Sequence, residues 1–207
     1  VESSLRSLER MAEEIRNALP PEPTQAQRRE TLHKFLFQEW GYHGSRHEYY
    51  VRENSYLDRV IDDREGIPIT LAVVYLDLAR RIGMTTHGIP LPGHFIVSHT
   101  VPDLPPIYID VFGQGKELTE PEMKLQVLAL TGSPPTSDQT APASGIRILE
   151  RMTRNLFALA QGDEDLEGMR RYSETLLILD PDAPDHHIKR ALIRFQLRDY
   201  QGALVDI

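Results

Sequence analysis

The chain has 207 residues, which is enough for one compact domain and a small second one. Its 31 acidic and 23 basic residues give a net charge of −8 without any basic block, which excludes a dominant nucleic-acid partner. The sequence contains no cysteine, so disulfides, thiolate metal sites and cysteine nucleophiles are excluded within these residues.

The first forty residues are predicted to form two helices. Apolar side chains recur at steps of three and four over residues 5–19, which indicates an amphipathic helix that ends before Pro20. Thr24 and Gln27 have the spacing of a capping box and predict the start of a second helix, which Gly41 would close. These two helices would precede the core of the domain.

The middle of the chain is predicted to hold the core helix. A turn is expected near Arg64, and residues 71–82 then carry apolar side chains over so wide a face that the helix must be central. Gly83 is a natural end for it. After this glycine the apolar period changes to two, and residues 94–98 and 107–112 are predicted to be strands joined by a proline-rich loop.

This predicted hairpin would bring a histidine and an aspartate together. If its loop is centred on Pro102, His94 and Asp110 lie directly opposite each other, with Cβ atoms about 5 Å apart. A slip of one residue would place them on opposite faces of the sheet. A carboxylate beside an imidazole fixes its tautomer and supports its protonated form, which is the base half of a nucleophilic triad.

The last part of the chain is predicted to be helical. Thr119 and Glu122 have capping-box spacing and predict another helix, after which residues 132–145 have the composition of a linker. Beyond it, residues 163–169 match residues 198–204 at a spacing of about 34–35 residues, the period of tetratricopeptide helix pairs. Two plain helical hairpins are the alternative. Because the chain lacks an initial methionine and ends within a predicted helix, we expect it to be a fragment.

Four short stretches carry a resemblance to a known family: Asn54–Leu57, Arg64–Leu71, Pro92–Phe95 and Ile109–Phe112. With the helical repeats that follow them, they resemble the transglutaminase-like superfamily, specifically its bacterial SirB-one type, which couples such a domain to tetratricopeptide repeats. The resemblance implies a papain-like arrangement, with a cysteine at the start of the core helix and a histidine and an aspartate on the following strands.

The resemblance assigns the triad positions one by one. Alignment of the family pattern on Gly66, Ala72 and Gly83 places the nucleophilic cysteine at Pro68, so proline stands at that position. His94 and Asp110 match the histidine and the aspartate of the triad.

Three interpretations of the His94–Asp110 pair stay open: a structural pair, a pair that contacts a ligand, and a catalytic pair. Thr70 is the hydroxyl nearest to the nucleophile position, in the first helical turn. A threonine hydroxyl is a weak nucleophile without strong activation, so the alternative is local hydrogen bonding at the helix start.

The other candidate binding residues lie around the predicted start of the core. Asn54 and Ser55 would cap the following helix or line a pocket, and Arg64 would form a salt bridge or bind an anionic group. Pro68 suits a first helical turn and would also line the pocket. Together with a groove, the nearby aromatic residues could grip a peptide; they are Trp40, Tyr42, Tyr49, Tyr50 and Tyr56.

No metal or other cofactor is expected. His43 and His47 are spaced by four residues, but Gly41 and Gly44 argue against a helix that would align them. A further group along the chain, His87, His94 and His99, has no acidic third ligand at a recognisable spacing.

The predicted elements indicate an α+β protein in which one central helix packs against a small antiparallel sheet. The family resemblance implies that this core is papain- or transglutaminase-like. We expect a transglutaminase-like domain with a helical cap at residues 1–131, a linker at 132–145 and helical repeats at 146–207. We expect the protein to be a pseudoenzyme that binds a protein or peptide. Since the sequence shows no membrane-spanning segment and no targeting signal, we expect it to act in the cytoplasm. The alternatives are an acyl-transfer enzyme or amide hydrolase that uses Thr70 or water, and a purely structural module.

Overall fold

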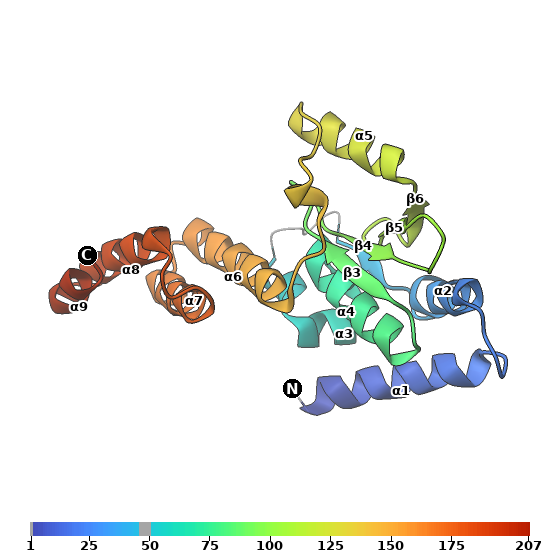
Figure 1. The fold of residues 1–207 in the computed structure, drawn as a ribbon. Coiled ribbons are helices and arrows are strands. Elements are labelled where there is room, and N and C mark those ends of the chain that lie inside the picture. Colours follow the sequence, from blue (N-terminus) through green and yellow to red (C-terminus); the bar gives the residue numbers. More distant parts are fainter. Residues whose placement is uncertain (1, 46–50) are drawn as a thin grey trace. The chain divides into compact units, whose positions relative to one another are not determined.

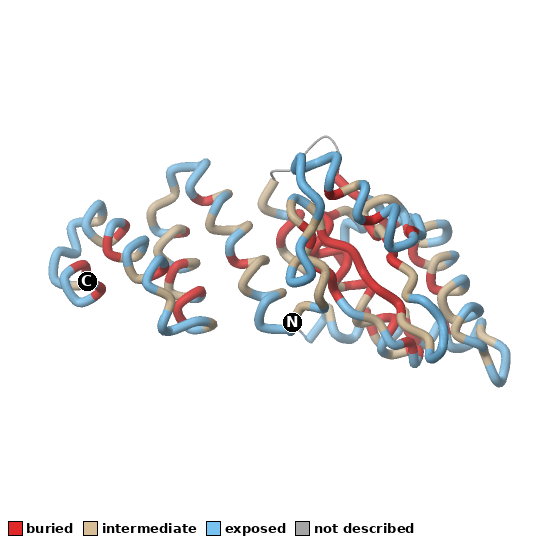
Figure 2. The backbone as a smooth tube through the Cα atoms, turned by 45° about the horizontal axis from the view of Figure 1, so that its top comes forward, coloured by how far each residue is buried: buried red, intermediate tan, exposed pale blue. Residues whose placement is uncertain are grey.

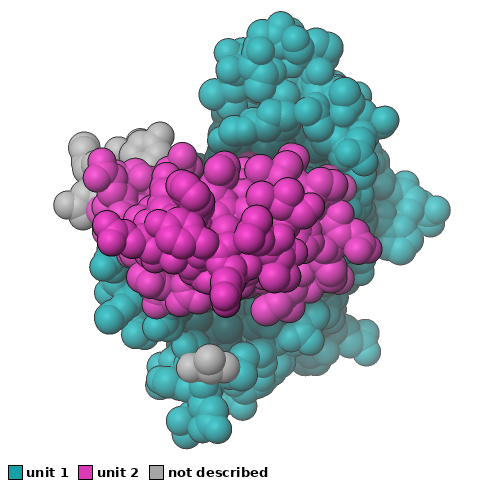
Figure 3. Space-filling view, turned by 90° about the vertical axis from the view of Figure 1, so that its left-hand side faces the viewer, with its two compact units in different colours: residues 1–49, 53–144 teal, residues 50–52, 145–207 magenta. Residues whose placement is uncertain are grey.

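The structure is a computed structural model that describes residues 2–45 and 51–207. The chain divides into two compact units, which Figure 3 distinguishes by colour. Unit 1 comprises residues 1–49 and 53–144, and unit 2 comprises residues 50–52 and 145–207. None of the described helices is long and apolar enough to cross a membrane.

Unit 1 contains a mixture of helices and short strands (Figure 1). Its α-helices are α1 (Glu2–Ala18), α2 (Gln25–His33), α3 (Leu57–Asp63), α4 (Pro68–Arg81) and α5 (Glu120–Thr131). Its strands are β1 (His43–Gly44), β2 (Glu65–Gly66), β3 (Thr86–Ile89), β4 (Ile96–His99), β5 (Ile107–Asp110) and β6 (Lys116–Leu118). Shorter helical turns are the π-helix η1 (Lys34–Glu39) and the 3₁₀ helices η2 (Arg52–Ser55) and η3 (Asp138–Thr140).

Helix α4 is the centre of unit 1, as its apolar face predicts. It starts with Pro68 at its first position, where a missing N–H costs nothing, and it ends before Gly83, whose φ of 78° is left-handed. Helices α1, α2 and α3 pack around it, and strands β3 and β4 cover another side. Tyr75 and Leu78 on α4 are fully buried. The residues of its first turn, from Pro68 to Leu71, are buried as well.

Four strands form an antiparallel sheet in the order β3-β4-β5-β6. Residues of β4 are buried on both faces of this sheet (Figure 2). On the α5 side lies a cluster of buried apolar residues: Ile89, Leu91, Ile96, Tyr108, Leu118, Met123 and Val127. The alternation along the strands directs Val97 and Ile109, which are paired and fully buried, to the opposite side. The sheet thus separates α5 from α4.

The predicted hairpin register is wrong by two residues. Val97 pairs with Ile109, so the turn is centred on Asp103, which has a φ of 64°, and not on Pro102. His94 consequently lies before β4 and is not directly opposite Asp110. Because the error is an even number of residues, it leaves both side chains on the same face of the sheet.

The predicted strands are also longer than those observed. The structure has the shorter strands β4 and β5 in place of strands at 94–98 and 107–112, and it adds β3 and β6 at their outer edges.

Both predicted capping boxes are confirmed: Thr24 accepts from Gln27 N–H at the start of α2, and Thr119 accepts from Glu122 N–H at the start of α5. Residues 132–144 belong to unit 1.

Residues 145–207 of unit 2 form four α-helices, each packed against the next along the chain. They are α6 (Gly145–Gly162), α7 (Leu166–Leu179), α8 (Pro184–Gln196) and α9 (Tyr200–Val205). The turn before α7 recurs before α9: Asp165 accepts from Gly168 N–H, and about 34 residues later Asp199 accepts from Gly202 N–H, both at 2.9 Å. The sequence match therefore corresponds to a repeated, aspartate-capped turn.

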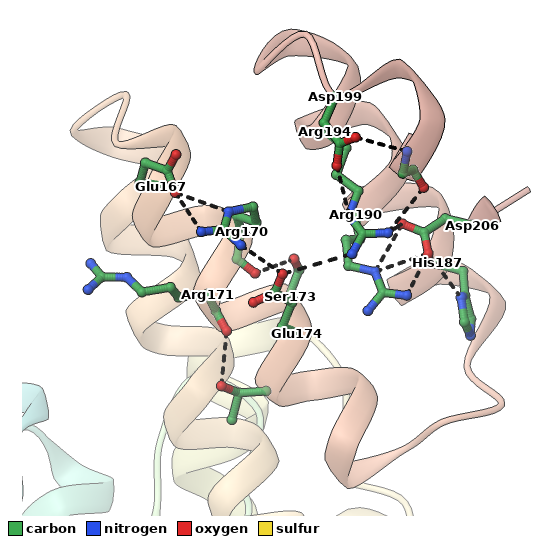
Figure 4. Close-up of polar contacts among 12 residues, drawn as sticks. Glu167, Arg170, Arg171, Ser173, Glu174, His187, Arg190, Arg194, Asp199 and Asp206 are labelled. Atoms are coloured by element: carbon green, nitrogen blue, oxygen red, sulfur yellow. Dashed lines mark hydrogen bonds and ion pairs between the residues drawn. The ribbon is translucent and has the colours of Figure 1, made fainter. Parts of the chain in front are cut away.

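A buried carboxylate ties α8 to the end of the chain (Figure 4). Asp206, whose side chain is 1% exposed, accepts hydrogen bonds from Arg190 Nε at 2.9 Å and from Arg194 Nη1 at 2.9 Å. Burial raises the pKa of Asp206, but the two guanidinium groups outweigh burial and hold this pKa below its ordinary value. Unit 2 thus has its own polar anchor.

Candidate functional site

The hairpin brings the two residues of the predicted pair into contact. His94 Nε2 lies 2.9 Å from Asp110 Oδ1, and the two side chains are only 16% and 14% exposed. His94 sits in the segment before β4, whereas Asp110 is the last residue of β5. The predicted juxtaposition of His94 and Asp110 is present despite the different register, because the histidine reaches the aspartate diagonally.

The carboxylate of this pair is held in its ionised form. Burial raises the pKa of Asp110, but the hydrogen bond and the charge of His94, together with the backbone N–H groups of Gly113 and Phe112, lower it below its ordinary value. Gly113 N–H donates to Asp110 Oδ1 at 3.0 Å. Since an ionised carboxylate only accepts, His94 donates to Asp110 through Nε2.

A tightly packed aromatic wall stands beside the pair. The ring of Phe112 meets the ring of His94 edge-on, with centroids 6.2 Å apart. On its other side Phe112 packs so closely on Gly44 that any Cβ there would overlap the ring. Gly44 in turn pairs with Gly66 in the parallel β1–β2 bridge, two residues before α4 begins. This chain of contacts links His94 to the start of the core helix.

Pro68, at the position that the family pattern gives to cysteine, is buried at the start of α4. The neighbouring hydroxyl of Thr70 is fully buried and donates to the carbonyl of Asn54 at 2.8 Å. It also accepts from Ile67 N–H at 3.2 Å. Thr70 therefore has the hydrogen-bonding partners expected of a residue that stabilises a helix start.

The remaining predicted binding residues lie in η2 and at the end of α3. Asn54 and Ser55 are buried in η2, but neither caps α3 as expected, because Tyr56 is the N-cap and makes no side-chain capping bond. Arg64 ends α3 in a left-handed conformation, with a φ of 61°, and donates to the carbonyl of Trp40 at 2.9 Å. The expected salt bridge of Arg64 is wrong for the described part of the chain, where no carboxylate lies within 4.0 Å of it.

Among the aromatic and histidine candidates, Trp40 and Tyr42 lie close together, and three others fall outside the described residues. Tyr49, Tyr50 and His47 lie outside the described residues. Tyr42 is buried and donates to the carbonyl of Ile61 at 3.0 Å, so its hydroxyl serves the core. Over residues 2–45 and 51–207, no three histidine, aspartate or glutamate side chains gather as metal ligands.

Sequence reasoning missed a polar network beneath α2. His33 Nε2 lies 3.0 Å from the hydroxyl of the buried Tyr75, and burial lowers the pKa of His33 to about 4. Nearby, Arg29 pairs with Glu117 at 2.6 Å and approaches His99 Nδ1 at 3.3 Å. Burial, and then the charge of Arg29, lowers the pKa of His99. No spacing in the sequence signals this network, because its members come from four elements.

The family described as "Transglutaminase-like superfamily" matches residues 2–154, which include α4, the sheet and the His94–Asp110 pair. No solved structure matches this chain.

Curated proteins of two kinds are similar to the chain. A "UPF0162 protein" of Xylella fastidiosa (strain Temecula1) is 34% identical over 181 residues, which cover 85% of this chain and 64% of that protein. The "UPF0162 protein YchA" of Escherichia coli is 28% identical over 199 residues, 94% of this chain and 71% of that protein. "F-box only protein 21" of Homo sapiens is 28% identical over 183 residues, 84% of this chain but only 28% of that protein. The chain thus spans less than two thirds of the length of the Xylella relative.

Proposed function

Because this chain belongs to the transglutaminase-like superfamily, we propose that it is a pseudoenzyme that binds a protein or peptide segment at the His94–Asp110 site. One observation carries the proposal: His94 and Asp110 are in contact, yet the chain has no cysteine, and the family pattern assigns its nucleophile position to Pro68. Without a thiolate, the pair lacks the nucleophile that the family pattern supplies, and its remaining role is to orient and hydrogen-bond a ligand.

The environment of Thr70 supports binding over catalysis. Its hydroxyl is committed to the carbonyl of Asn54 and is shielded from solvent, whereas a nucleophile must hydrogen-bond to its base and reach a substrate. His94, with part of its side chain exposed, is the better placed of the two for contact with a ligand. A peptide backbone, with its alternating donors and acceptors, suits a site formed by an imidazole and an aromatic wall.

For unit 2 we propose helix pairs of the tetratricopeptide type, and hence membership of the SirB-one branch. The repeated capped turns at Asp165 and Asp199 support this, as does the sequential packing of α6 to α9. Such pairs commonly present side chains to partner proteins, so both units would serve binding, with a regulatory role for the whole protein.

The relatives support a module that works in more than one protein context. Similar sequence makes up most of the bacterial UPF0162 proteins but only 28% of human F-box only protein 21. A domain used beside different neighbouring sequence is consistent with recognition of a partner.

The proposal is tested by measuring binding and turnover on the same material. An array of immobilised peptides probed with the whole chain should retain it at particular sequences, and His94→Gln should lose this retention while the far-ultraviolet circular dichroism is unchanged. His87→Gln is the matched control, because His87 is an exposed histidine of β3 in the same sheet.

The rival is an acyl-transfer enzyme or amide hydrolase that uses Thr70 or water with His94 and Asp110. Fluorogenic peptide amides and a glutamine–amine transamidation assay should show no turnover above buffer. Turnover that both His94→Gln and Thr70→Val abolish would establish the threonine enzyme, and turnover that only His94→Gln abolishes would establish the water-dependent one. Either result would overturn the pseudoenzyme proposal.

A further inference from the structure

Unit 1 contains a second recess, built from elements that the His94–Asp110 site does not use. It has a volume of about 260 Å³ and lies between α1, the end of η1 and α3. Its apolar lining comes from Met11 and Ile61, with the buried ring of Tyr42. The volume is below the range of about 300–1,000 Å³ that drug-sized ligands occupy, so the recess suits a ligand of amino-acid size.

Two walls of this recess carry charge, and each wall carries both signs. Arg10 and Glu14 are contributed by α1, four residues apart and therefore on one face of that helix. Asp62 and Arg64 are contributed by α3 and its C-cap. Within the described part of the chain none of these four side chains has an ion-pair partner within 4.0 Å. The recess is therefore lined by two cations and two anions that form no ion pair with one another.

The recess is preformed. Arg64 is fixed by its left-handed backbone and by donation from Nη1 to the carbonyl of Trp40 at 2.9 Å, so its other guanidinium donors are oriented in advance. The hydroxyl of Tyr42 donates to the carbonyl of Ile61 at 3.0 Å and holds the floor. Trp40 lines the recess and is half-buried, so its indole adds a flat apolar surface.

We infer that this recess binds a small zwitterion with an apolar side chain: a free amino acid or a short peptide with both termini charged. The ligand carboxylate would meet the guanidinium groups of Arg10 and Arg64, and its ammonium group would meet Glu14 and Asp62. Its side chain would lie against Trp40 and the apolar floor. A ligand with one charge alone would pair with two wall charges and leave the two wall charges of its own sign without partners.

The only tryptophan of the chain is Trp40, so its fluorescence reports directly on the recess. The probes are L-leucine and leucyl-leucine, which distinguish the free amino acid from the peptide, together with N-acetyl-leucine and leucinamide, which each carry one charge. A saturable change with L-leucine or leucyl-leucine at about 1 mM or below is expected, and the singly charged probes should bind about tenfold or more weakly.

Arg10→Gln and Asp62→Asn should each weaken binding of the zwitterion about tenfold, because both remove a charge at an exposed position. Arg6→Gln is the matched control: Arg6 is also on α1, with a side chain 78% exposed, and does not line the recess. The inference is overturned if neither zwitterion gives a saturable change, if singly charged probes bind equally well, or if Arg10→Gln and Asp62→Asn behave like the control.

Discussion

The His94–Asp110 contact has an energetic signature that a double-mutant cycle can measure. His94→Ala leaves the Asp110 carboxylate with the backbone N–H groups of Gly113 and Phe112, and Asp110→Ala removes a partner of His94 and of Gly113. A hydrogen bond to a charged group contributes about 1.5–3 kcal/mol, and the 16% and 14% exposures leave little room for solvent to replace it. We therefore expect a coupling energy of about 1–3 kcal/mol.

Urea unfolding of the wild type, both single variants and the double variant measures this coupling. Trp40 lies in unit 1, so its fluorescence follows the unit that contains the pair. Because the pKa of Asp110 is lowered in the folded state, the stability that the ionised carboxylate contributes is complete above its ordinary value of 3.8 and is lost as pH falls through the lowered value. A coupling below about 0.5 kcal/mol at neutral pH would refute the reasoning.

Three further perturbations test the packing and the charges of the two units. Because the pKa of His33 is lowered to about 4, the free energy of unfolding should fall by up to about 3 kcal/mol as pH falls from 6.5 towards 4. A series of urea-unfolding measurements against pH tests this, and His33→Gln should flatten that part of the series. Gly44→Ala should lower the free energy of unfolding by about 1–3 kcal/mol, since its Cβ would overlap the ring of Phe112; thermal unfolding followed by Trp40 fluorescence measures it. Asp206→Asn should destabilise unit 2 by about 3 kcal/mol, seen as an earlier loss of helical circular dichroism that leaves the Trp40 transition unchanged.

Local signals in the sequence were sufficient for the starts of helices α2 and α5. The capping boxes at Thr24 and Thr119 are confirmed because each depends only on residues three apart, which the chain brings together by itself. The π-helix η1 was not predictable, because its hydrogen bonds, such as Trp40 N–H to the carbonyl of Phe35, span five residues without changing the apolar pattern.

The strands and their register were predicted less well, because they depend on contacts that no sequence pattern indicates. Strands β3 and β6 have four and three residues, too few for alternation to stand out, and β3 contains Gly88. The hairpin register was missed because the turn uses Asp103 at a positive φ, a role that the sequence alone assigned to the neighbouring proline. The face of the sheet was nevertheless right, so His94 and Asp110 were identified as neighbours from the period of two.

The other candidate residues were chosen for their type, and their partners come from distant segments. Arg64 was expected to find a carboxylate, but the left-handed end of α3 directs it to the carbonyl of Trp40. The recess beside it joins α1 to α3, which are separated by about forty residues, and only the fold brings those walls together.

The most direct test of the central claim is to restore a cysteine at the nucleophile position with Pro68→Cys. If this position faces the His94–Asp110 pair at the start of α4, the introduced thiol should ionise well below its ordinary pKa of about 8.5, at about 7 or lower. Ultraviolet thiolate absorbance against pH measures this, with the exposed Ser133→Cys as a reference thiol. We predict that adding His94→Ala raises the pKa of the introduced thiol towards that of the reference; a pKa at or above the reference that His94→Ala does not change would contradict the account.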